Sequence, residues 1–293
     1  MMTGTILRGV GGFYYIQTET GDIWCCRARG IFRKQGVRPL PGDIASFEIT
    51  HEGDAEGSIT DIHPRRSELL RPAVANADQS LAVFAMKDPE PSPNLIDRVL
   101  LHMKTREMPV LLVFQKRDLA GAKREAYLRE LYAGCGAELF FVSARTGEGV
   151  DALRERLAGH ITVMAGPSGV GKSTLLNRLC GAEQMETGGL SEKIRRGRHT
   201  TRYTELFPLP DGGYLFDTPG FGSLILPEME PEDLASWYPE FQNEIGSCRF
   251  AGCVHMGETD CGVKDAVRLG RIPAPRYQNY RIFFEELEAA RRY

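Results

Sequence analysis

The sequence has no long hydrophobic run and no excess of charge of either sign. No stretch of about 18 apolar residues occurs, so no membrane-spanning helix and no membrane partner are expected. The 36 basic and 39 acidic side chains give a net charge of −3, which excludes a uniformly basic nucleic-acid binder but not local basic patches. The first residues, MMTGTILRGVGG, lack the charged start and apolar core of a signal peptide. A cytoplasmic protein with reduced thiols is therefore expected.

The chain also lacks the even cysteine count of a disulfide framework. Its 7 cysteines cannot all pair, and three of them fall with one histidine in the fourteen residues Cys248–Cys261. The pattern Cys248-x4-Cys253-x-His255-x5-Cys261 supplies three thiolates and one imidazole, which satisfy tetrahedral zinc. Because this set leaves no open position, we expect one structural Zn²⁺. The alternative is free cysteines beside a surface histidine.

The chain is long enough, at 293 residues with 42% hydrophobic side chains, for two or three globular domains. Residues 1–70 contain five short β-type runs, separated by glycine-containing turns and without a helical period. We expect strands at Thr5–Val10, Phe13–Thr18, Asp22–Arg27, Ala45–Thr50 and Ser58–His63. This pattern predicts a small barrel of the OB type. An SH3-like barrel fits almost as well.

One segment of this first domain, residues 27–38, is basic. It contains five cations and no acid: Arg27, Arg29, Arg33, Lys34 and Arg38. Cations along a loop suit a phosphate backbone, and the nearby Phe32 can stack on a base, so the segment is a candidate RNA contact. The alternative is a solvated loop whose phenylalanine fills the barrel.

Residues 71–225 alternate between strand and helix after a predicted linker, Arg71–Gln79. Strands are expected at Leu81–Met86, Val110–Phe114, Leu139–Val142, Ile161–Met164 and Tyr214–Phe216. Helices are expected from Ser92-Pro93 onward and at Ala122–Tyr132 and Gly149–Leu157. Such alternation predicts a parallel sheet covered by helices, with ligands bound at the carboxyl ends of the strands.

A phosphate-binding loop follows the strand at Ile161–Met164. Its pattern, G-x-x-x-x-G-K-[ST], is met by the run Gly166, Pro167, Ser168, Gly169, Val170, Gly171, Lys172, Ser173, with Thr174 next in the helix. Glycines let backbone N–H groups turn toward phosphate oxygens, and the helix N-terminus adds positive potential. Lys172 is expected to reach the β- and γ-phosphates, and the Ser173 hydroxyl to bind Mg²⁺.

A second strand-end element is Asp217-Thr-Pro-Gly220. An aspartate beside a phosphate loop can hold Mg²⁺ through water, and the Gly220 N–H can contact the γ-phosphate.

Together with three further elements, these motifs resemble those of the translation-factor-like P-loop GTPases. The base-reading element is Gln115-Lys116-Arg117-Asp118, its supporting element is Ser143-Ala144-Arg145, and the switch I threonine is Thr201 or Thr200. The resemblance implies that Asp118 reads guanine, Lys116 packs along the base and Thr201 binds Mg²⁺. Lys172, Thr201 and Gly220 are the expected catalytic contacts. The base-reading pair precedes the phosphate loop, so the domain is circularly permuted.

Two positions depart from the family pattern. Gln115 stands where asparagine is usual and offers the same amide on a longer arm, so guanine selectivity is still expected with weaker affinity. Phe221 follows the switch II glycine, where many GTPases have the glutamine that orients water. Slow intrinsic hydrolysis, completed by groups from elsewhere, is therefore expected. The alternative is that His199 of switch I substitutes.

Residues 226–293 form the third expected domain, helical and zinc-binding. A short helix is expected at Pro231–Tyr238. Tyr277, Tyr280, Phe284 and Leu287 form a stripe at helical spacing. Core packing is the preferred interpretation of this stripe, and RNA stacking is the alternative.

The order of barrel, permuted GTPase and Cys3His segment resembles the bacterial ribosome small subunit-dependent GTPase A family along essentially the whole chain. The resemblance implies a monomeric cytoplasmic GTPase in late maturation of the small ribosomal subunit. It implies binding of 16S rRNA, stimulation by the subunit and contacts with other assembly factors. The basic stretch 193–202 in switch I is compatible with docking on RNA. An RNA-binding regulator with incidental hydrolysis remains an alternative, and a small-molecule kinase is disfavoured by the base-reading and switch II elements.

Overall fold

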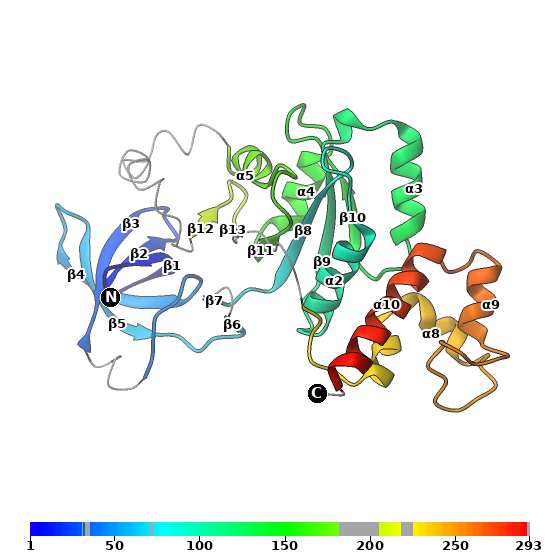
Figure 1. The fold of residues 1–293 in the computed structure, drawn as a ribbon. Coiled ribbons are helices and arrows are strands. Elements are labelled where there is room, and N and C mark those ends of the chain that lie inside the picture. The colour runs from blue at the N-terminus through cyan, green and yellow to red at the C-terminus, as the bar shows by residue number, and fades with distance from the viewer. Residues whose placement is uncertain (31, 33–35, 71–72, 182–204, 218–224, 292–293) are drawn as a thin grey trace. The chain divides into compact units, whose positions relative to one another are not determined.

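The computed structural model describes residues 1–30, 32, 36–70, 73–181, 205–217 and 225–291 (Figure 1). The chain folds into two compact units. One comprises Met1–Gln79, Ala152–Met164 and Leu175–Pro219, and the other comprises Ser80–Asp151, Ala165–Thr174 and Gly220–Tyr293. Each unit therefore combines segments that lie far apart in the sequence. The predicted division into 1–70, 71–225 and 226–293 stays a prediction.

The first five strands close into a barrel with the order β1-β2-β3-β5-β4. Their bounds are Met2–Val10, Phe13–Thr18, Ile23–Ala28, Ile44–His51 and Glu56–Ile62. β3 pairs with β5 in parallel, whereas β1 pairs with both β2 and β4 in antiparallel fashion. All five predicted strands are confirmed, and the closed order with its one parallel pair favours the OB-type barrel over the SH3-like one.

The position of Phe32 in the barrel distinguishes between the two interpretations of this residue, stacking on a base and filling the barrel. Its side chain is 6% exposed and packs in one cluster with residues of the strands, among them Trp24 and Phe47. The aromatic ring therefore fills the barrel and is not available for stacking on a base. Arg29 is about half exposed and pairs with Glu48 at 2.5 Å. Arg33 and Lys34 of the same basic segment lie outside the described residues.

The segment predicted as a linker, Arg71–Gln79, is instead structured where it is described. Strands β6 (Glu68–Leu70) and β7 (Ala73–Ala75) form an antiparallel hairpin. Val74 and Ala75 are fully buried, because the hairpin packs closely on the barrel turn at Gly42. A Cβ atom at Gly42, where φ is +91°, would lie 2.0 Å from the Ala75 carbonyl oxygen. Tertiary packing thus gives this segment a regular structure that the sequence did not predict.

An ion pair reinforces the same junction. The Asp43 side chain is completely buried, and both of its oxygens accept hydrogen bonds from Arg65, at 2.7 and 2.8 Å. The Leu40 backbone N–H donates to the same carboxylate at 2.7 Å. The barrel is therefore fixed to the hairpin through charged and backbone contacts as well as apolar ones.

The central strands follow the order β11-β13-β12 in the first unit and β10-β9-β8 in the second. In the first unit, β11 (Ile161–Ala165) pairs in parallel with β13 (Tyr214–Asp217), which pairs antiparallel with β12 (Leu206–Pro208). In the second unit, β9 (Val110–Gln115) pairs in parallel with both β8 (Gln79–Ala85) and β10 (Glu138–Phe141). β8, β9 and β11 are buried along their whole length, as continuous apolar runs predict.

Helices follow these strands as the alternating pattern predicts. They are α2 (Pro93–Lys104), α3 (Ala122–Tyr132), α4 (Val150–Leu157) and α5 (Lys172–Cys180), with a short 3-10 turn, η1 (Arg117–Leu119). The predicted start of α2 is confirmed: the Ser92 hydroxyl accepts a hydrogen bond from the Leu95 N–H at 3.4 Å, and Pro93 occupies the first turn.

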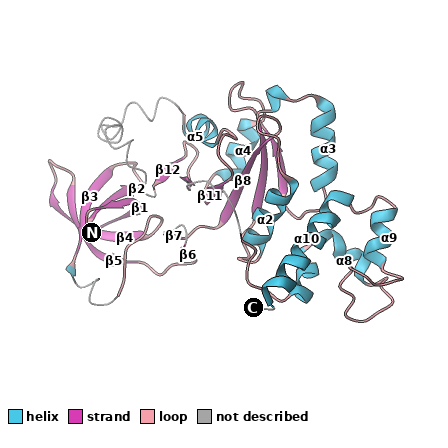
Figure 2. Ribbon diagram, in the orientation of Figure 1, coloured by secondary structure: helices cyan, strands magenta, loops and turns pink. Residues whose placement is uncertain are grey.

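The C-terminal segment is mainly helical (Figure 2). It contains η2 (Pro231–Trp237), α8 (Pro239–Ile245), α9 (Gly262–Arg268) and α10 (Ala274–Arg291). Tyr280, Phe284 and Leu287 are buried in one apolar cluster together with Leu101 of α2, so the core interpretation of the aromatic stripe is confirmed. None of the helices in the described part of the chain combines the length and apolarity that a bilayer crossing requires.

Candidate functional site

The phosphate loop connects β11 to α5 in the predicted strand–loop–helix order. Gly166 follows the buried strand, and a Cβ atom there would lie 2.1 Å from the Val83 carbonyl oxygen. The Lys172 ammonium donates to the Gly166 and Pro167 carbonyl oxygens, both at 2.8 Å, so its charge lies over the loop. Ser173 and Thr174 are exposed in the first turn of α5, where unpaired backbone N–H groups favour an anion.

Gln115 joins the phosphate loop to the base-reading loop. The residue ends β9 and is 3% exposed. Its amide nitrogen donates to the Gly171 carbonyl oxygen at 3.4 Å, and its amide oxygen accepts from the backbone N–H of Ala144 at 3.5 Å and from that of Lys116. The Gln115 amide therefore ties the base-reading loop to the phosphate loop.

Lys116 makes a second connection between the same two loops. Its backbone is left-handed, with φ +63°, and its ammonium donates to the Gly169 carbonyl oxygen at 2.7 Å and to that of Asp88. The aliphatic stem of the side chain therefore crosses from the base-reading loop to the phosphate loop. A stem in this place can pack along a base bound beside it.

Asp118 presents a carboxylate held by two side chains of the supporting element. The buried Ser143 hydroxyl donates to Oδ1 at 2.5 Å, and the Arg145 guanidinium donates to Oδ2 from Nε at 2.9 Å and from Nη2 at 2.6 Å. The Ser143 hydrogen bond is the main cause that lowers the pKa of Asp118 below its ordinary value, and Arg145 adds to it. The carboxylate is therefore ionised at neutral pH and can accept hydrogen bonds from a ligand.

Not every predicted residue points toward these loops. The Arg117 side chain pairs with Glu125 at 2.7 Å and with Glu148 at 3.0 Å, so it stabilises the base-reading loop from the side of α3. Asp217 ends β13, in register with Met164, in the other compact unit. His199, Thr200, Thr201, Gly220 and Phe221 lie outside the described residues.

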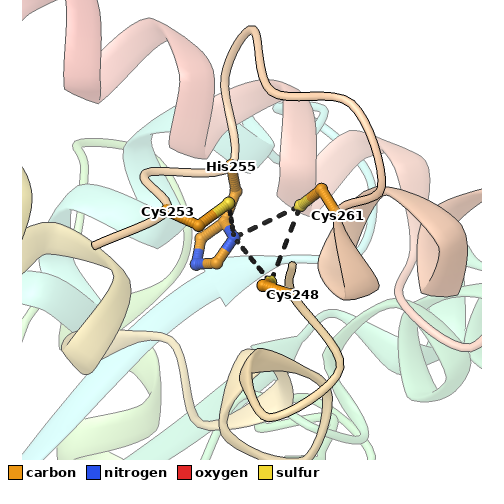
Figure 3. A group of neighbouring side chains, drawn as sticks. All are labelled: Cys248, Cys253, His255 and Cys261. Carbon is orange, nitrogen blue, oxygen red and sulfur yellow. Dashed lines mark hydrogen bonds between the residues drawn. The ribbon is translucent and has the colours of Figure 1, made fainter. Parts of the chain in front are cut away.

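The four predicted zinc ligands converge (Figure 3). The His255 Nδ1 atom lies 3.6, 3.4 and 3.3 Å from the sulfur atoms of Cys248, Cys253 and Cys261. The sulfur atoms of Cys248 and Cys261 are 4.0 Å apart, and all four ligand atoms lie within 4.8 Å of one another. Zinc bonds of about 2.3 Å to sulfur and about 2.0 Å to nitrogen separate tetrahedral ligands by roughly 3.5–3.8 Å. The cluster therefore fits one tetrahedral Zn²⁺.

The surrounding protein holds this cluster in place but does not by itself favour thiolates. Burial raises the pKa of Cys253 to about 12 and lowers that of His255, so thiolate ligation needs the charge of a metal ion. The ligand loop is held by its backbone. The Tyr277 and Tyr280 hydroxyls donate to the carbonyl oxygens of His255 and Val254, each at 2.7 Å.

Two parts of these sites are not evident in the sequence. The tyrosines of α10 support the metal loop as well as packing in the core, and this role depends on a contact that spans more than 20 residues. The contact between Arg145 and the base-reading carboxylate also depends on the fold. For the role of the tyrosines, the sequence offers one signal: two tyrosines one helical turn apart, close downstream of the Cys3His pattern.

Two family models match the chain. The sequence model of the family described as RsgA GTPase matches residues 62–227, and that of the RsgA N-terminal domain matches residues 3–59. The proteins named small ribosomal subunit biogenesis GTPase RsgA from Agathobacter rectalis and Moorella thermoacetica are 44% and 46% identical, over 100% and 99% of both chains.

Two solved structures are similar over almost the whole chain. YjeQ from Thermotoga maritima is 35% identical, with a TM-score of 0.77 over 98% of both chains. YloQ, described as a circularly permuted GTPase, is 32% identical, with a TM-score of 0.77 over 99% of this chain and 96% of its own.

Proposed function

The chain belongs to the RsgA GTPase family, and from that premise we propose which of its residues bind the nucleotide and what stimulates the reaction. The protein is a GTPase: it converts GTP and water to GDP and phosphate. The full-length similarity to relatives named for biogenesis of the small ribosomal subunit carries the assignment to that process, with the small subunit as its partner.

In the proposed site, Asp118 accepts two hydrogen bonds from guanine, which adenine cannot supply. Ser143 orients that carboxylate, Lys116 packs along the base, and Ala144 supports the base-reading loop through Gln115. The hydrogen bonds that converge on Gln115 and Asp118 support these roles.

The phosphates bind to Lys172 and to backbone N–H groups of the loop Gly166–Thr174, in which Pro167 has no N–H to donate. When Mg²⁺ is bound it neutralises the phosphate charge. Ser173 supplies a hydroxyl to Mg²⁺, and Thr201 and Asp217 complete the proposed magnesium site.

Phe221 cannot polarise water, so we propose that groups outside this chain complete hydrolysis. Gly220 donates its N–H to the γ-phosphate.

A Gly171→Ala variant is expected to bind GDP at least about tenfold more weakly. Gly171 has φ +96°, and a Cβ atom there would lie 2.5 Å from the Gln115 amide nitrogen. A left-handed alanine alone costs about 1–2 kcal/mol, which corresponds to about 5- to 30-fold in affinity, and the clash with Gln115 adds to this loss. Titration calorimetry with GDP measures the change.

The matched control combines this change with Gln115→Ala. Because the second substitution removes the clashing amide, the two losses in affinity should be less than additive. Full additivity would mean that Gln115 and Gly171 do not interact, and would contradict the proposed junction of the two loops.

We further propose that the chain binds 16S rRNA, through the basic segment 27–38 and the stretch 193–202, and that the bound subunit stimulates hydrolysis. Support comes from the local concentration of cations in a chain with a net charge of −3. Burial of Phe32 limits the contribution of the first segment to electrostatic contacts. Contacts with other assembly factors and a monomeric state are further proposals.

Turnover of GTP is expected to rise on the order of 10³-fold with purified small subunits and to stay at the intrinsic rate with large subunits, because groups supplied in trans contribute at least that much in related GTPases. Phosphate release measures turnover.

Lys172→Ala should abolish the stimulated rate, whereas Lys123→Ala, on the exposed face of α3, should not. Stimulation by both subunits equally would contradict the proposal. GTP-dependent binding to small subunits without stimulation would favour a regulator for which hydrolysis is incidental.

A further inference from the structure

The two oxygens of the Asp118 carboxylate are not equally occupied. Oδ1 accepts one hydrogen bond, from the Ser143 hydroxyl at 2.5 Å. Oδ2 accepts two, from Nε and Nη2 of the same Arg145 guanidinium. Since a carboxylate oxygen has two lone pairs, Arg145 uses both acceptor positions of Oδ2, whereas the neighbouring side chains use only one position of Oδ1.

The two neighbours differ in how firmly they are held. The Ser143 side chain is completely buried, and its oxygen also accepts from the Thr146 N–H at 3.2 Å. The Arg145 side chain is 72% exposed, against 10% for Asp118. Ser143 is therefore a fixed support of the carboxylate, whereas Arg145 can leave it for solvent.

Arginine and guanine offer this carboxylate the same chemical group. The guanine edge that a carboxylate reads consists of an N1–H and a C2 amino N–H on one guanidine-like carbon, and the guanidinium fork presents two N–H donors in the same way. A base that donates one hydrogen bond to each oxygen therefore needs an acceptor position that Arg145 fills.

We propose that Arg145 is a built-in competitor of guanine: it occupies the Oδ2 atom of Asp118 and must be displaced before the base can use both carboxylate oxygens. This inference rests on the proposed reading of guanine by Asp118. Arg145 is a specificity-determining residue in this arrangement, because it acts only on ligands that need Oδ2. Hypoxanthine, which keeps N1–H but lacks the C2 amino group, can donate to the remaining position on Oδ1 while Arg145 stays in place.

The test compares GDP with inosine diphosphate on the full-length protein by titration calorimetry. In Arg145→Met, which keeps the apolar stem and removes the donors, the affinity for GDP should rise about two- to fivefold, the range typical of an exposed ion pair. The affinity for inosine diphosphate should not change. In an Asp118→Ala background, Arg145→Met should have no effect on GDP.

Arg129→Met is the matched control. Arg129 is 53% exposed, and like those of Arg145 its Nε and Nη2 donate to a single oxygen, Oε1 of Glu125, at 2.9 and 2.7 Å. Its removal should change the affinity for neither nucleotide. Because Arg145 is largely exposed, circular dichroism of its variant should match that of the parent.

The results for Asp118→Ala and Arg145→Met distinguish a failure of guanine reading by Asp118 from a failure of competition by Arg145. Unchanged GDP affinity in Asp118→Ala would show that Asp118 does not read the base. Weaker GDP binding in Asp118→Ala, combined with unchanged or weaker binding in Arg145→Met, would overturn the competition alone. An equal gain for GDP and inosine diphosphate would also overturn it, because the effect would then not depend on Oδ2.

Discussion

A Cys261→Ser variant is expected to lose its zinc and to unfold the segment from Cys248 to Cys261. Structural zinc sites of this kind contribute about 10–16 kcal/mol of apparent binding free energy at neutral pH, and much of this is folding free energy. The other anchors of the ligand loop are hydrogen bonds, and they include those from Tyr277 and Tyr280 and those that the Glu258 carboxylate accepts from the N–H groups of Val254 and Met256 at 2.6 and 2.8 Å.

The loss should spread beyond the loop. Cys261 is 1% exposed, is the residue before α9, and belongs to the apolar cluster that includes Phe241 and Tyr280. Serine is a poor zinc ligand, so the variant would lose the ion and with it the bonds that join the three remaining ligands. We therefore expect α9 to lose its packing together with the loop.

Metal analysis and thermal unfolding measure the effect. The parent chain should contain one zinc per molecule, and a chelator should lower its Tm, whereas the variant should contain none and be insensitive to the chelator. Cys25→Ser, at a partly buried cysteine of the barrel, should keep its zinc. A parent chain with less than one zinc and with unchanged folding after chelation would rule out the site.

An Arg276→Met variant is expected to lower the free energy of unfolding by about 3–5 kcal/mol, the usual cost of removing one partner from a buried ion pair. The Arg276 side chain is 3% exposed. It pairs with Asp97, which is completely buried, and with Glu240 at 2.7 Å, which is 7% exposed. Asn279 also donates to the Asp97 carboxylate, at 2.6 Å. Removal of the cation would leave two carboxylates buried without a counter-charge.

The loss should depend on pH. Burial raises the pKa of Asp97 from 3.8 to about 6, against the opposing effect of the Arg276 charge. An acid whose pKa is higher in the folded state than in the unfolded state lowers stability as pH rises from the unfolded pKa through the folded one. Without Arg276 the folded-state pKa rises further. The variant should therefore be least stable relative to the parent at pH 8 and should approach it at pH 5.

Urea denaturation at the two pH values measures the difference. Arg271→Met, which removes an exposed partner of Glu244 at 2.8 Å, should leave the unfolding midpoint unchanged. Adding Asp97→Asn and Glu240→Gln to Arg276→Met should recover much of the loss, because no buried charge then remains. Equal losses at both pH values would contradict the electrostatic explanation and favour one based on packing.

Local patterns predicted most of the secondary structure. β9 and α3 lie within one residue of their expected ends, because apolar periodicity and turn residues act over only a few positions. The phosphate loop and the zinc ligands were also found from spacing, since each is one continuous segment. Their chemistry requires those residue types in that order.

Contacts between distant segments were not predictable in this way. Asp97 and Arg276 are 179 residues apart, and nothing near either residue indicates the other. The hairpin at β7 was mistaken for a linker because its small side chains become buried only through the close approach of Gly42. The contact between Arg145 and Asp118 could not be predicted either, since exposed arginines are common in loops. Such features depend on packing between elements, which a sequence window does not contain.

The contacts between α2 and α10 affect the stability of shortened fragments of the protein. A chain shortened after residue 225 would retain Gln115, Asp118 and the phosphate loop. It would lose the partners that α10 supplies to α2: Arg276 and Asn279 for Asp97, and Glu286, which accepts from Arg98 at 3.0 Å. We therefore expect a fragment that ends near residue 225, although it retains these nucleotide-binding elements, to be less stable than the full chain. After a proteolytic cut or a premature stop codon near this residue, we expect aggregation rather than a free GTPase.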